Sequence, residues 1–142
     1  MIKAMNAQEK ELFLYVAEDA TYETGDQAIF KASDFVGATA VTGVENKTIF
    51  RFYPQDLTRV NILDIDAPPA LDSFTLTHTD NAHIEVMKAV ADAMTNPHGG
   101  VVVVADPSNT YGKGTSELEL SPIASTGTAV TISAVAITTV DA

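Results

Sequence analysis

The chain contains no cysteine and no tryptophan, and only 8 lysine and arginine residues stand against 19 aspartate and glutamate residues in a total of 142. Without cysteine, disulfides and thiolate-bound metals are excluded. The net charge of −11 argues against a nucleic acid or an anionic membrane as partner, because both would repel an acidic surface. The absence of tryptophan also weakens a sugar-binding function, which usually needs an aromatic platform.

Long hydrophobic runs are missing as well. The longest weakly polar run, residues 128–140, is shorter than the roughly 20 residues of a membrane-spanning helix, and threonine and serine interrupt it. Residues 1–20 lack the apolar core of a secretory signal. We therefore expect no membrane partner and no export.

The length fits one domain. A compact chain of this size buries roughly 68–70% of the surface that its unfolded form exposes, so an ordinary apolar core suffices. Pro68 and Pro69 interrupt the chain near its middle, but the composition is similar on both sides, which indicates a loop rather than a domain boundary. We predict a single β-rich domain over residues 1–142.

The middle of the chain carries the clearest secondary-structure pattern. Residues 47–53 mix β-branched and aromatic side chains and stop at Pro54, as a strand does. Residues 73–79 alternate apolar and hydroxyl side chains with the period of a strand, and residues 80–96 place apolar side chains at helical spacing. Residues 101–104 are four valines, typical of a strand buried on both faces. The pattern predicts a strand, a helix and a strand in that order.

Three further strands are predicted, at residues 58–65, 116–120 and 128–140. Residues 11–17 fit either a helix start or a buried strand. Short apolar pieces follow at 28–32 and 35–41, and the small and polar residues that divide them suit turns or strand edges. The last strand is long and almost uncharged, so we expect it to be central in the sheet or paired across a subunit boundary. The predicted fold class is α+β, mainly an antiparallel β-sheet or sandwich with one α-helix, at about residues 80–95, packed on it.

Residue types that could do chemistry are few. A metal or acid–base role for His78, His83 or His98 needs two of them to converge with a carboxylate, and we expect these histidines to be structural. Residues 111–116 resemble a phosphate loop, but Pro107 and Gly114 stand where the motif needs glycine and a hydroxyl residue, and a flexible hairpin loop is favoured. No catalytic residue is predicted.

Acidic residues gather between positions 64 and 72. Asp64, Asp66 and Asp72 could surround a calcium ion, which prefers oxygen ligands. The segment lacks the EF-hand pattern and contains two prolines, so a solvated acidic loop is favoured, with weak cation binding left open. No resident metal and no cofactor are predicted.

Residues 72–106, DSFTLTHTDNAHIEVMKAVADAMTNPHGGVVVVAD, place a threonine-rich strand, a helix, a glycine step and a valine strand in order. This segment resembles small virion structural proteins of marine tailed phages, including capsid proteins of the cyanophage type. The strands at 47–53 and 128–140 also fall where such chains carry β segments, so the resemblance covers about two thirds of the chain. Residues 1–34 depart from the pattern, and we expect them to form an extended N-terminal arm that reaches a neighbouring subunit.

The resemblance implies a non-enzymatic protein that decorates or cements a capsid through contacts with the major capsid protein. It also implies synthesis in the host cytoplasm, a final location on the capsid surface and assembly as a homo-oligomer. The expected interface is the apolar part of the last strand, namely Val130, Ile132, Val135 and Ile137. Two alternatives stay open: a tail, neck or fibre component of the virion, and a small-ligand or cation-binding module that uses the polar segments 64–72 and 106–116.

Overall fold

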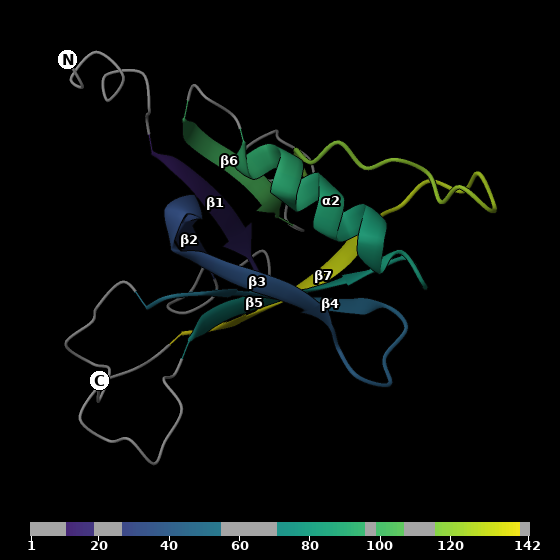
Figure 1. Ribbon diagram of the computed structural model, residues 1–142, viewed down its shortest axis with the longest axis horizontal. Helices are drawn as coiled ribbons and strands as arrows, with labels where there is room; N and C mark the ends of the chain where they lie inside the picture. The colour runs from purple at the N-terminus through teal and green to yellow at the C-terminus, as the bar shows by residue number, and fades with distance from the viewer. Residues whose placement is uncertain (1–10, 19–26, 55–70, 96–98, 107–115, 140–142) are drawn as a thin grey trace.

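A computed structural model describes residues 11–18, 27–54, 71–95, 99–106 and 116–139. These residues form strands, a short 3-10 helix and an α-helix (Figure 1). In chain order the elements are β1 (Leu12–Ala17), β2 (Gln27–Lys31), η1 (Ala32–Asp34), β3 (Phe35–Ala40), β4 (Lys47–Phe52), β5 (Asp72–His78), α2 (His83–Met94), β6 (Gly100–Ala105) and β7 (Ile132–Thr138).

The strands divide into two sheets. The three-stranded sheet has the order β2-β1-β6, with β1 antiparallel to β2 and parallel to β6. The four-stranded sheet is antiparallel throughout and has the order β3-β4-β5-β7. The prediction of a mostly β fold of the α+β class is confirmed, and the described residues contain one α-helix, α2. The predicted succession of strand, helix and strand is present as β5, α2 and β6, although β6 pairs with β1 in the other sheet.

A cluster of phenylalanines joins the two sheets. Phe30 of β2 lies with its ring centroid 4.9 Å from that of Phe52 and 5.2 Å from that of Phe74. Phe50 and Phe74 stack at 5.1 Å across the β4–β5 pair, where they stand directly opposite each other. Aromatic pairs at these separations add about 0.5–1.5 kcal/mol each to the hydrophobic gain. The cluster therefore holds the sheets together over a common core.

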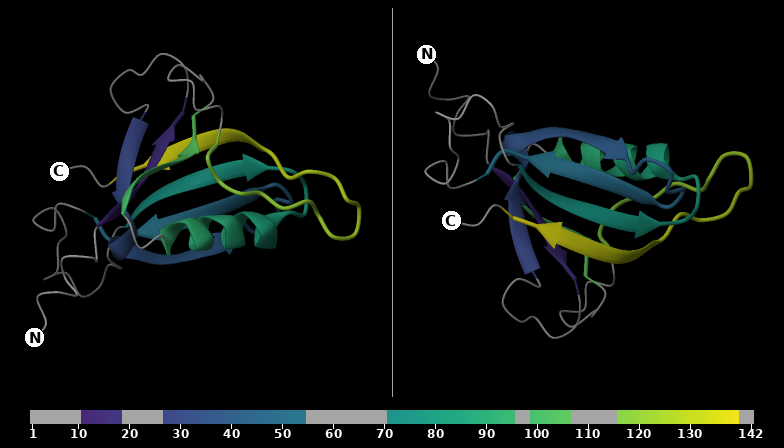
Figure 2. Two further views of the ribbon diagram at one scale, coloured as in Figure 1. Left: turned by 90° about the horizontal axis from the view of Figure 1, so that it is seen from above. Right: turned by 90° about the horizontal axis from the view of Figure 1, so that it is seen from below.

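Helix α2 covers this core on one side of the four-stranded sheet. Seen from above, α2 lies in front of the sheet, and seen from below it lies behind (Figure 2). Its side chains Val86, Ala89 and Val90 are buried, as the helical spacing of apolar residues in 80–96 predicts. The helix begins at His83, because Asn81 takes a φ of 60° and turns the chain between β5 and α2.

One strand prediction is corrected, and another lies outside the described residues. Residues 116–120 form no strand, because Glu117 alone bonds to β6, with its backbone N–H donating to the Val103 carbonyl oxygen at 2.7 Å. Residues 58–65 lie outside the described residues. The ambiguous residues 11–17 are strand β1, the central strand of the three-stranded sheet.

The expected N-terminal arm over residues 1–34 is wrong for the described part of that range. Leu14 and Val16 of β1 are fully buried, and Phe30 of β2 is 3% exposed. An arm that reaches a neighbour cannot at the same time supply the centre of a sheet, so residues 11–18 and 27–34 belong to the body of the fold.

Strand β7 differs from its prediction in length and in position. It covers residues 132–138 instead of 128–140, and it lies at an edge of the four-stranded sheet, beside β5 only. Within one chain the expectation of a central strand is therefore wrong. Its pairing across a subunit boundary stays a prediction.

Candidate functional site

The apolar side chains expected to form an interface on the last strand lie in the core instead. Val130 is 4% exposed, Ile132 and Val135 are each 8% exposed, and Ile137 packs partly buried against the same core. A side chain already packed inside its own subunit offers no surface to a partner. The expected interface at Val130, Ile132, Val135 and Ile137 is thus corrected.

The reason is a bulge in β7. The pairing register of β5 with β7 shifts between Thr77 and His78, which leaves Ser133 as an extra residue in β7. A bulge shifts the in–out alternation of a strand by one residue. Ile132 and Val135, three positions apart, therefore both point into the core. Strict alternation, assumed from the sequence, puts them on opposite faces.

The outer face of the three-stranded sheet presents a different apolar surface. Phe13 stands opposite Val101, and Tyr15 stands opposite both Ile29 and Val103. Their neighbours Leu12, Leu14 and Val104 point inward and are buried, so these five side chains share the opposite, outward face. We call this set the outer apolar face: Phe13, Tyr15, Ile29, Val101 and Val103.

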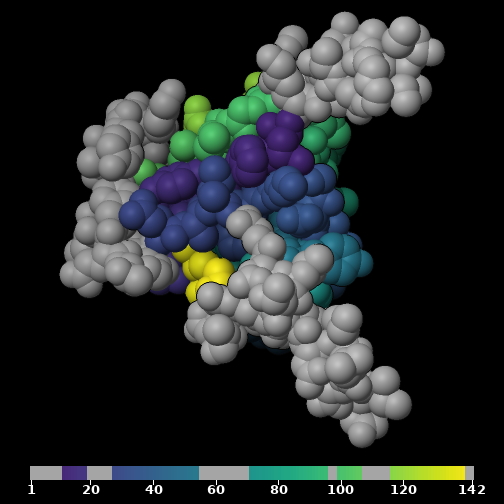
Figure 3. All heavy atoms as spheres, turned by 90° about the vertical axis from the view of Figure 1, so that its left-hand side faces the viewer, coloured from purple at the N-terminus to yellow at the C-terminus, as the bar shows by residue number. Residues whose placement is uncertain are grey.

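The outer apolar face is open to solvent. Val101 is 55% exposed and Ile29 is 43% exposed, while the other three members are partly buried. In Figure 3 the purple atoms of β1 and the blue atoms of β2 reach the molecular surface side by side. Ile29 on β2 and Val101 on β6 are thus exposed on either side of the partly buried Phe13 and Tyr15 of β1, and apolar side chains gathered on one partly exposed face are typical of a surface that contacts another protein. The expectation that the valine strand is buried on both faces is wrong at Val101.

The borders of this face are polar, but their charges are engaged. Lys31 Nζ lies 4.0 Å from Glu11 Oε1. The Tyr15 hydroxyl donates to Gln27 Oε1 at 3.0 Å. Glu117 Oε1 accepts a hydrogen bond from the Val103 backbone N–H at 2.8 Å. The five side chains of the face are themselves uncharged on a protein that carries a net charge of −11, and such a face suits a protein contact better than a charged ligand.

A second cluster joins two histidines through one hydroxyl. Thr48 Oγ1 of β4 lies 2.8 Å from His78 Nε2 of β5 and 2.9 Å from His83 Nδ1 at the start of α2. The two rings meet edge to face, with centroids 4.9 Å apart. Thr48 is fully buried and His78 is 3% exposed. The structure thus brings two of the three histidines together, while His98 lies outside the described residues.

The direction of these hydrogen bonds follows from one carbonyl group. His78 Nδ1 lies 2.8 Å from the Thr79 carbonyl oxygen, which can only accept, so Nδ1 carries a proton. Neutral His78 then accepts at Nε2 from the Thr48 hydroxyl, and the Thr48 oxygen accepts from His83 Nδ1–H. Burial lowers the pKa of His78, because a desolvated imidazole resists positive charge.

Chemically, this cluster is poorly placed for catalysis. The Thr48 hydroxyl has no exposed surface, so no substrate can reach it as a nucleophile. His78 and His83 both form hydrogen bonds with this hydroxyl, and these bonds hold β4, β5 and α2 together. His78 and His83 are recognisable in the sequence as candidate site residues, but Thr48 is not, because nothing in a strand sequence distinguishes a buried hydroxyl from a surface one.

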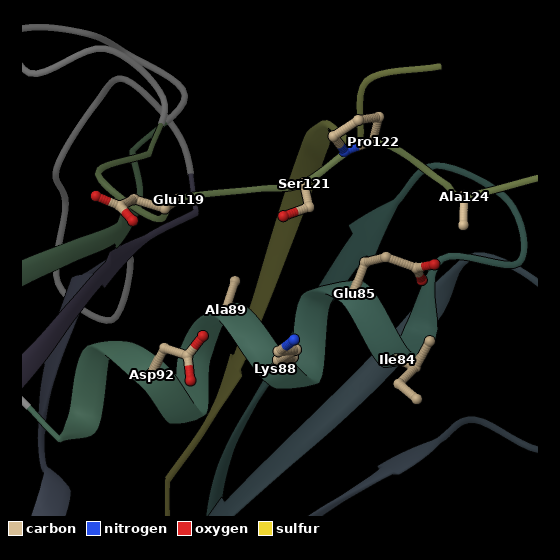
Figure 4. Close-up of a pocket in the computed structure, with 9 residues that line it drawn as sticks. All are labelled: Ile84, Glu85, Lys88, Ala89, Asp92, Glu119, Ser121, Pro122 and Ala124. Carbon is tan, nitrogen blue, oxygen red and sulfur yellow. The ribbon is translucent and has the colours of Figure 1, made fainter. Parts of the chain in front are cut away.

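A groove runs between α2 and the segment 119–124 (Figure 4). It has a volume of about 360 Å³, and its polar lining includes Glu85, Asp92 and Glu119 against the single base Lys88. The Oε2 atom of Glu85 is buried and has no hydrogen-bond partner within the described structure. A smaller hollow of about 290 Å³ adjoins it along α2. The groove is acidic, and the described residues hold no group of three or more potential metal ligands.

Most residues of the polar segments 64–72 and 106–116 lie outside the described residues. Asp64 and Asp66 lie outside the described residues, and so do positions 107–115 of the polar loop. Asp72 begins β5 and is 8% exposed, so it belongs to the sheet. Cation binding by residues 64–72 accordingly stays a prediction. Among the described helices, α2 is too short and too polar to cross a membrane.

Comparison with known proteins identifies no relative of this chain: no family model, no curated protein and no solved structure matches it.

Proposed function

We propose that this chain is a non-enzymatic structural protein of a virion, which decorates or cements the capsid by docking its outer apolar face on the major capsid protein. The outer apolar face, with Val101 and Ile29 exposed, carries the proposal, because a lone subunit gains nothing from leaving such side chains in water. The resemblance of residues 72–106 supports the class of partner.

Decoration of a shell does not need a tight single contact. Each subunit meets an equivalent site on a repeating lattice, so a modest apolar surface suffices when several linked subunits bind together. The burial of Thr48 also supports the proposal, since the hydroxyl that lies between His78 and His83 is out of reach of a substrate. A structural role fits these two observations better than an enzymatic one.

The direct test is the copy number of this chain in purified virus particles, measured by quantitative mass spectrometry against the major capsid protein. We expect on the order of hundreds of copies per particle, as a shell lattice requires. A count of about a dozen or fewer would assign the chain to the tail, neck or a fibre, the alternative that the sequence leaves open. Absence from particles would overturn the structural proposal.

A matched pair of variants tests the surface itself. Val101→Asp places a charge on the most exposed member of the outer apolar face, whereas Ile84→Asp makes the same kind of change on α2, where the side chain is 71% exposed. Co-sedimentation with capsids that lack this protein should fall at least tenfold for Val101→Asp and stay unchanged for Ile84→Asp. Equal binding by both variants would show that another surface makes the contact.

The acidic groove beside α2 favours a second candidate function, a module that binds a small ligand or a cation. Anything that binds only the folded state raises the melting temperature. Thermal unfolding in the presence of millimolar Ca²⁺ or of a panel of small cationic ligands tests this function. A capsid subunit should show no shift, and a shift that disappears in Glu85→Gln and Glu119→Gln would favour the binding module.

A further inference from the structure

Two of the sheet edges are blocked by glutamates. At the β6 edge, Glu117 engages both backbone groups of Val103. The Glu117 carboxylate accepts a hydrogen bond from the Val103 N–H, and the Glu117 N–H donates to the Val103 carbonyl oxygen. At the β7 edge, the Glu18 carboxylate accepts the outward N–H of Ile137 at 2.5 Å. A carboxylate on an edge N–H prevents another strand from using that donor, and proteins commonly protect edges with charge.

The β3 edge of the four-stranded sheet lacks this protection. Val41 N–H donates to the Lys47 carbonyl oxygen at 3.0 Å, which makes Val41 and Lys47 a hydrogen-bonded pair. Such pairs alternate along an antiparallel ladder. Thr39 is therefore bonded to β4, while the backbone N–H and C=O groups of Ala38 and Ala40 point away from it. In the described structure, no strand lies beyond them.

The β3 edge is built from apolar, small and hydroxyl residues. Residues 35–41 read FVGATAV and carry no charge, in a protein with a net charge of −11. Val36 is the extra residue of a bulge and is 45% exposed, and a Cβ added at Gly37 would meet nothing within 4 Å. A bulge is itself a device that protects an edge, but this one is confined to Val36, and the regular residues 38–40 beyond it have small side chains that leave room for a neighbouring strand.

We propose that the β3 edge pairs antiparallel with β3 of a second copy of this chain across a two-fold axis, joining the two four-stranded sheets into one. In this register Ala38 stands opposite Ala40 of the partner subunit, and Ala40 stands opposite Ala38 of the partner subunit. The four outward N–H groups then meet four carbonyl oxygens, about four new hydrogen bonds in all.

Charge is the reason to name a second copy as the occupant. Two chains with a net charge of −11 repel one another wherever acidic surfaces meet. The residues of β3 carry no charge themselves, and Thr39 Oγ1 accepts a hydrogen bond from the Arg51 guanidinium at 2.8 Å, so β3 brings no carboxylate to a contact with a second copy. An antiparallel two-fold pair needs only the same donors and acceptors on both strands. This inference goes beyond the capsid proposal and does not depend on it.

The test is the molar mass of the purified protein, measured by size-exclusion chromatography with light scattering up to about 500 μM, a range that detects weak dimers. Ala40→Pro removes the outward N–H without touching a β4 bond, because Ala40 is not hydrogen-bonded to β4. Ala40→Ser keeps the N–H and serves as the control. We expect a dimer for the unmodified chain and for Ala40→Ser, and at least tenfold weaker dimerisation for Ala40→Pro.

A monomeric unmodified protein at about 500 μM would overturn the proposal, and so would an Ala40→Pro dimer as stable as the original. If Ala40→Pro does not fold, hydrogen exchange of the unmodified protein decides. Protection of the Ala38 and Ala40 amides should then rise with protein concentration, while that of Thr39, already bonded to β4, should not. Concentration-independent exchange at Ala38 and Ala40 would also refute the pairing.

Discussion

The hydroxyl of Thr48 lies 2.8 Å from Nε2 of His78, and both residues are almost completely enclosed by the core. This contact satisfies a ring nitrogen that water cannot reach. The other ring nitrogen of His78 is bonded to the Thr79 carbonyl oxygen. A buried polar group of this kind is stable only while all of its partners are present, and the stability of the corner between β4, β5 and α2 therefore depends on one hydroxyl.

Replacing that hydroxyl by a methyl group should destabilise the protein. Thr48→Val keeps the shape of the side chain but leaves His78 Nε2 and His83 Nδ1 without their shared partner. The cost of a buried unsatisfied polar atom is about 1–3 kcal/mol. Urea unfolding should show this loss in the free energy of unfolding, whereas Thr75→Val, a control on the outer side of β5, should change it by less than about 0.5 kcal/mol. Equal effects in both variants would contradict the proposed role of Thr48.

Stability should also fall in mildly acidic solution. Burial lowers the pKa of His78 below its ordinary value of 6.5, so the unfolded chain binds a proton at this residue at a pH where the folded chain does not. The contribution of neutral His78 is fully present well above pH 6.5. It is lost as the pH falls from 6.5 toward the pKa of the folded state, with a slope of at most about 1.4 kcal/mol per pH unit.

Urea unfolding at several pH values between 8 and about 5 measures this slope, in a range where most carboxylates stay ionised. His78→Asn is the matched control, because the difference between the two slopes isolates His78 from the other histidines. We expect a shallower dependence in the variant. Parallel curves for the two proteins would show that His78 titrates alike in the folded and unfolded states.

The Glu18 carboxylate should contribute stability at the far end of the sheets. It follows β1 in the three-stranded sheet and accepts the Ile137 N–H of β7 in the four-stranded sheet at 2.5 Å. Glu18→Ala should lower the free energy of unfolding by about 1 kcal/mol, the typical value of one such bond. Glu119→Ala removes the same charge from an exposed position and should have almost no effect. An equal loss in both would indicate a general charge effect.

Ile132 and Val101 should respond in opposite ways to the same kind of change. Ile132 is 8% exposed and Val101 is 55% exposed. Ile132→Asp buries a charge and should cost more than about 4 kcal/mol, enough to unfold a domain of ordinary stability. Val101→Asp should leave the circular dichroism spectrum and the melting temperature nearly unchanged. A folded Ile132→Asp protein would mean that β7 is less enclosed than its burial indicates.

The parts of the fold that the sequence predicts well are those whose pattern is local. The strands at 47–53 and 73–79 and the helix within 80–96 each have a clear period, and the structure confirms them with shifts of a few residues at their ends. The ends shift because caps and turns are set by neighbouring elements. The false strand at 116–120 has the right alternation, yet only Glu117 finds a backbone partner in β6.

The sequence does not show which faces of the strands are buried and which are exposed. Residues 11–17 lack a period because Leu12, Leu14 and Val16 face the core while Phe13 and Tyr15 lie on the outer apolar face. A strand with apolar side chains on both sides looks the same whether one side is covered or open. In β7 the sequence predicts exposed apolar side chains that are in fact buried. One extra residue at the bulge changes which side chains of the strand point into the core.

The bond between Glu18 and Ile137 joins residues that are 119 positions apart, and β7 completes a sheet begun at β3. During synthesis at about 5–20 residues per second, β3 and β4 leave the ribosome well before the strand that closes their sheet. For several seconds the nascent chain carries the buried side of β5 without its neighbour β7. The four-stranded sheet can therefore be completed only after the ribosome has released residues 132–138, and until then the unpaired edge of β5 is open to contacts with other chains.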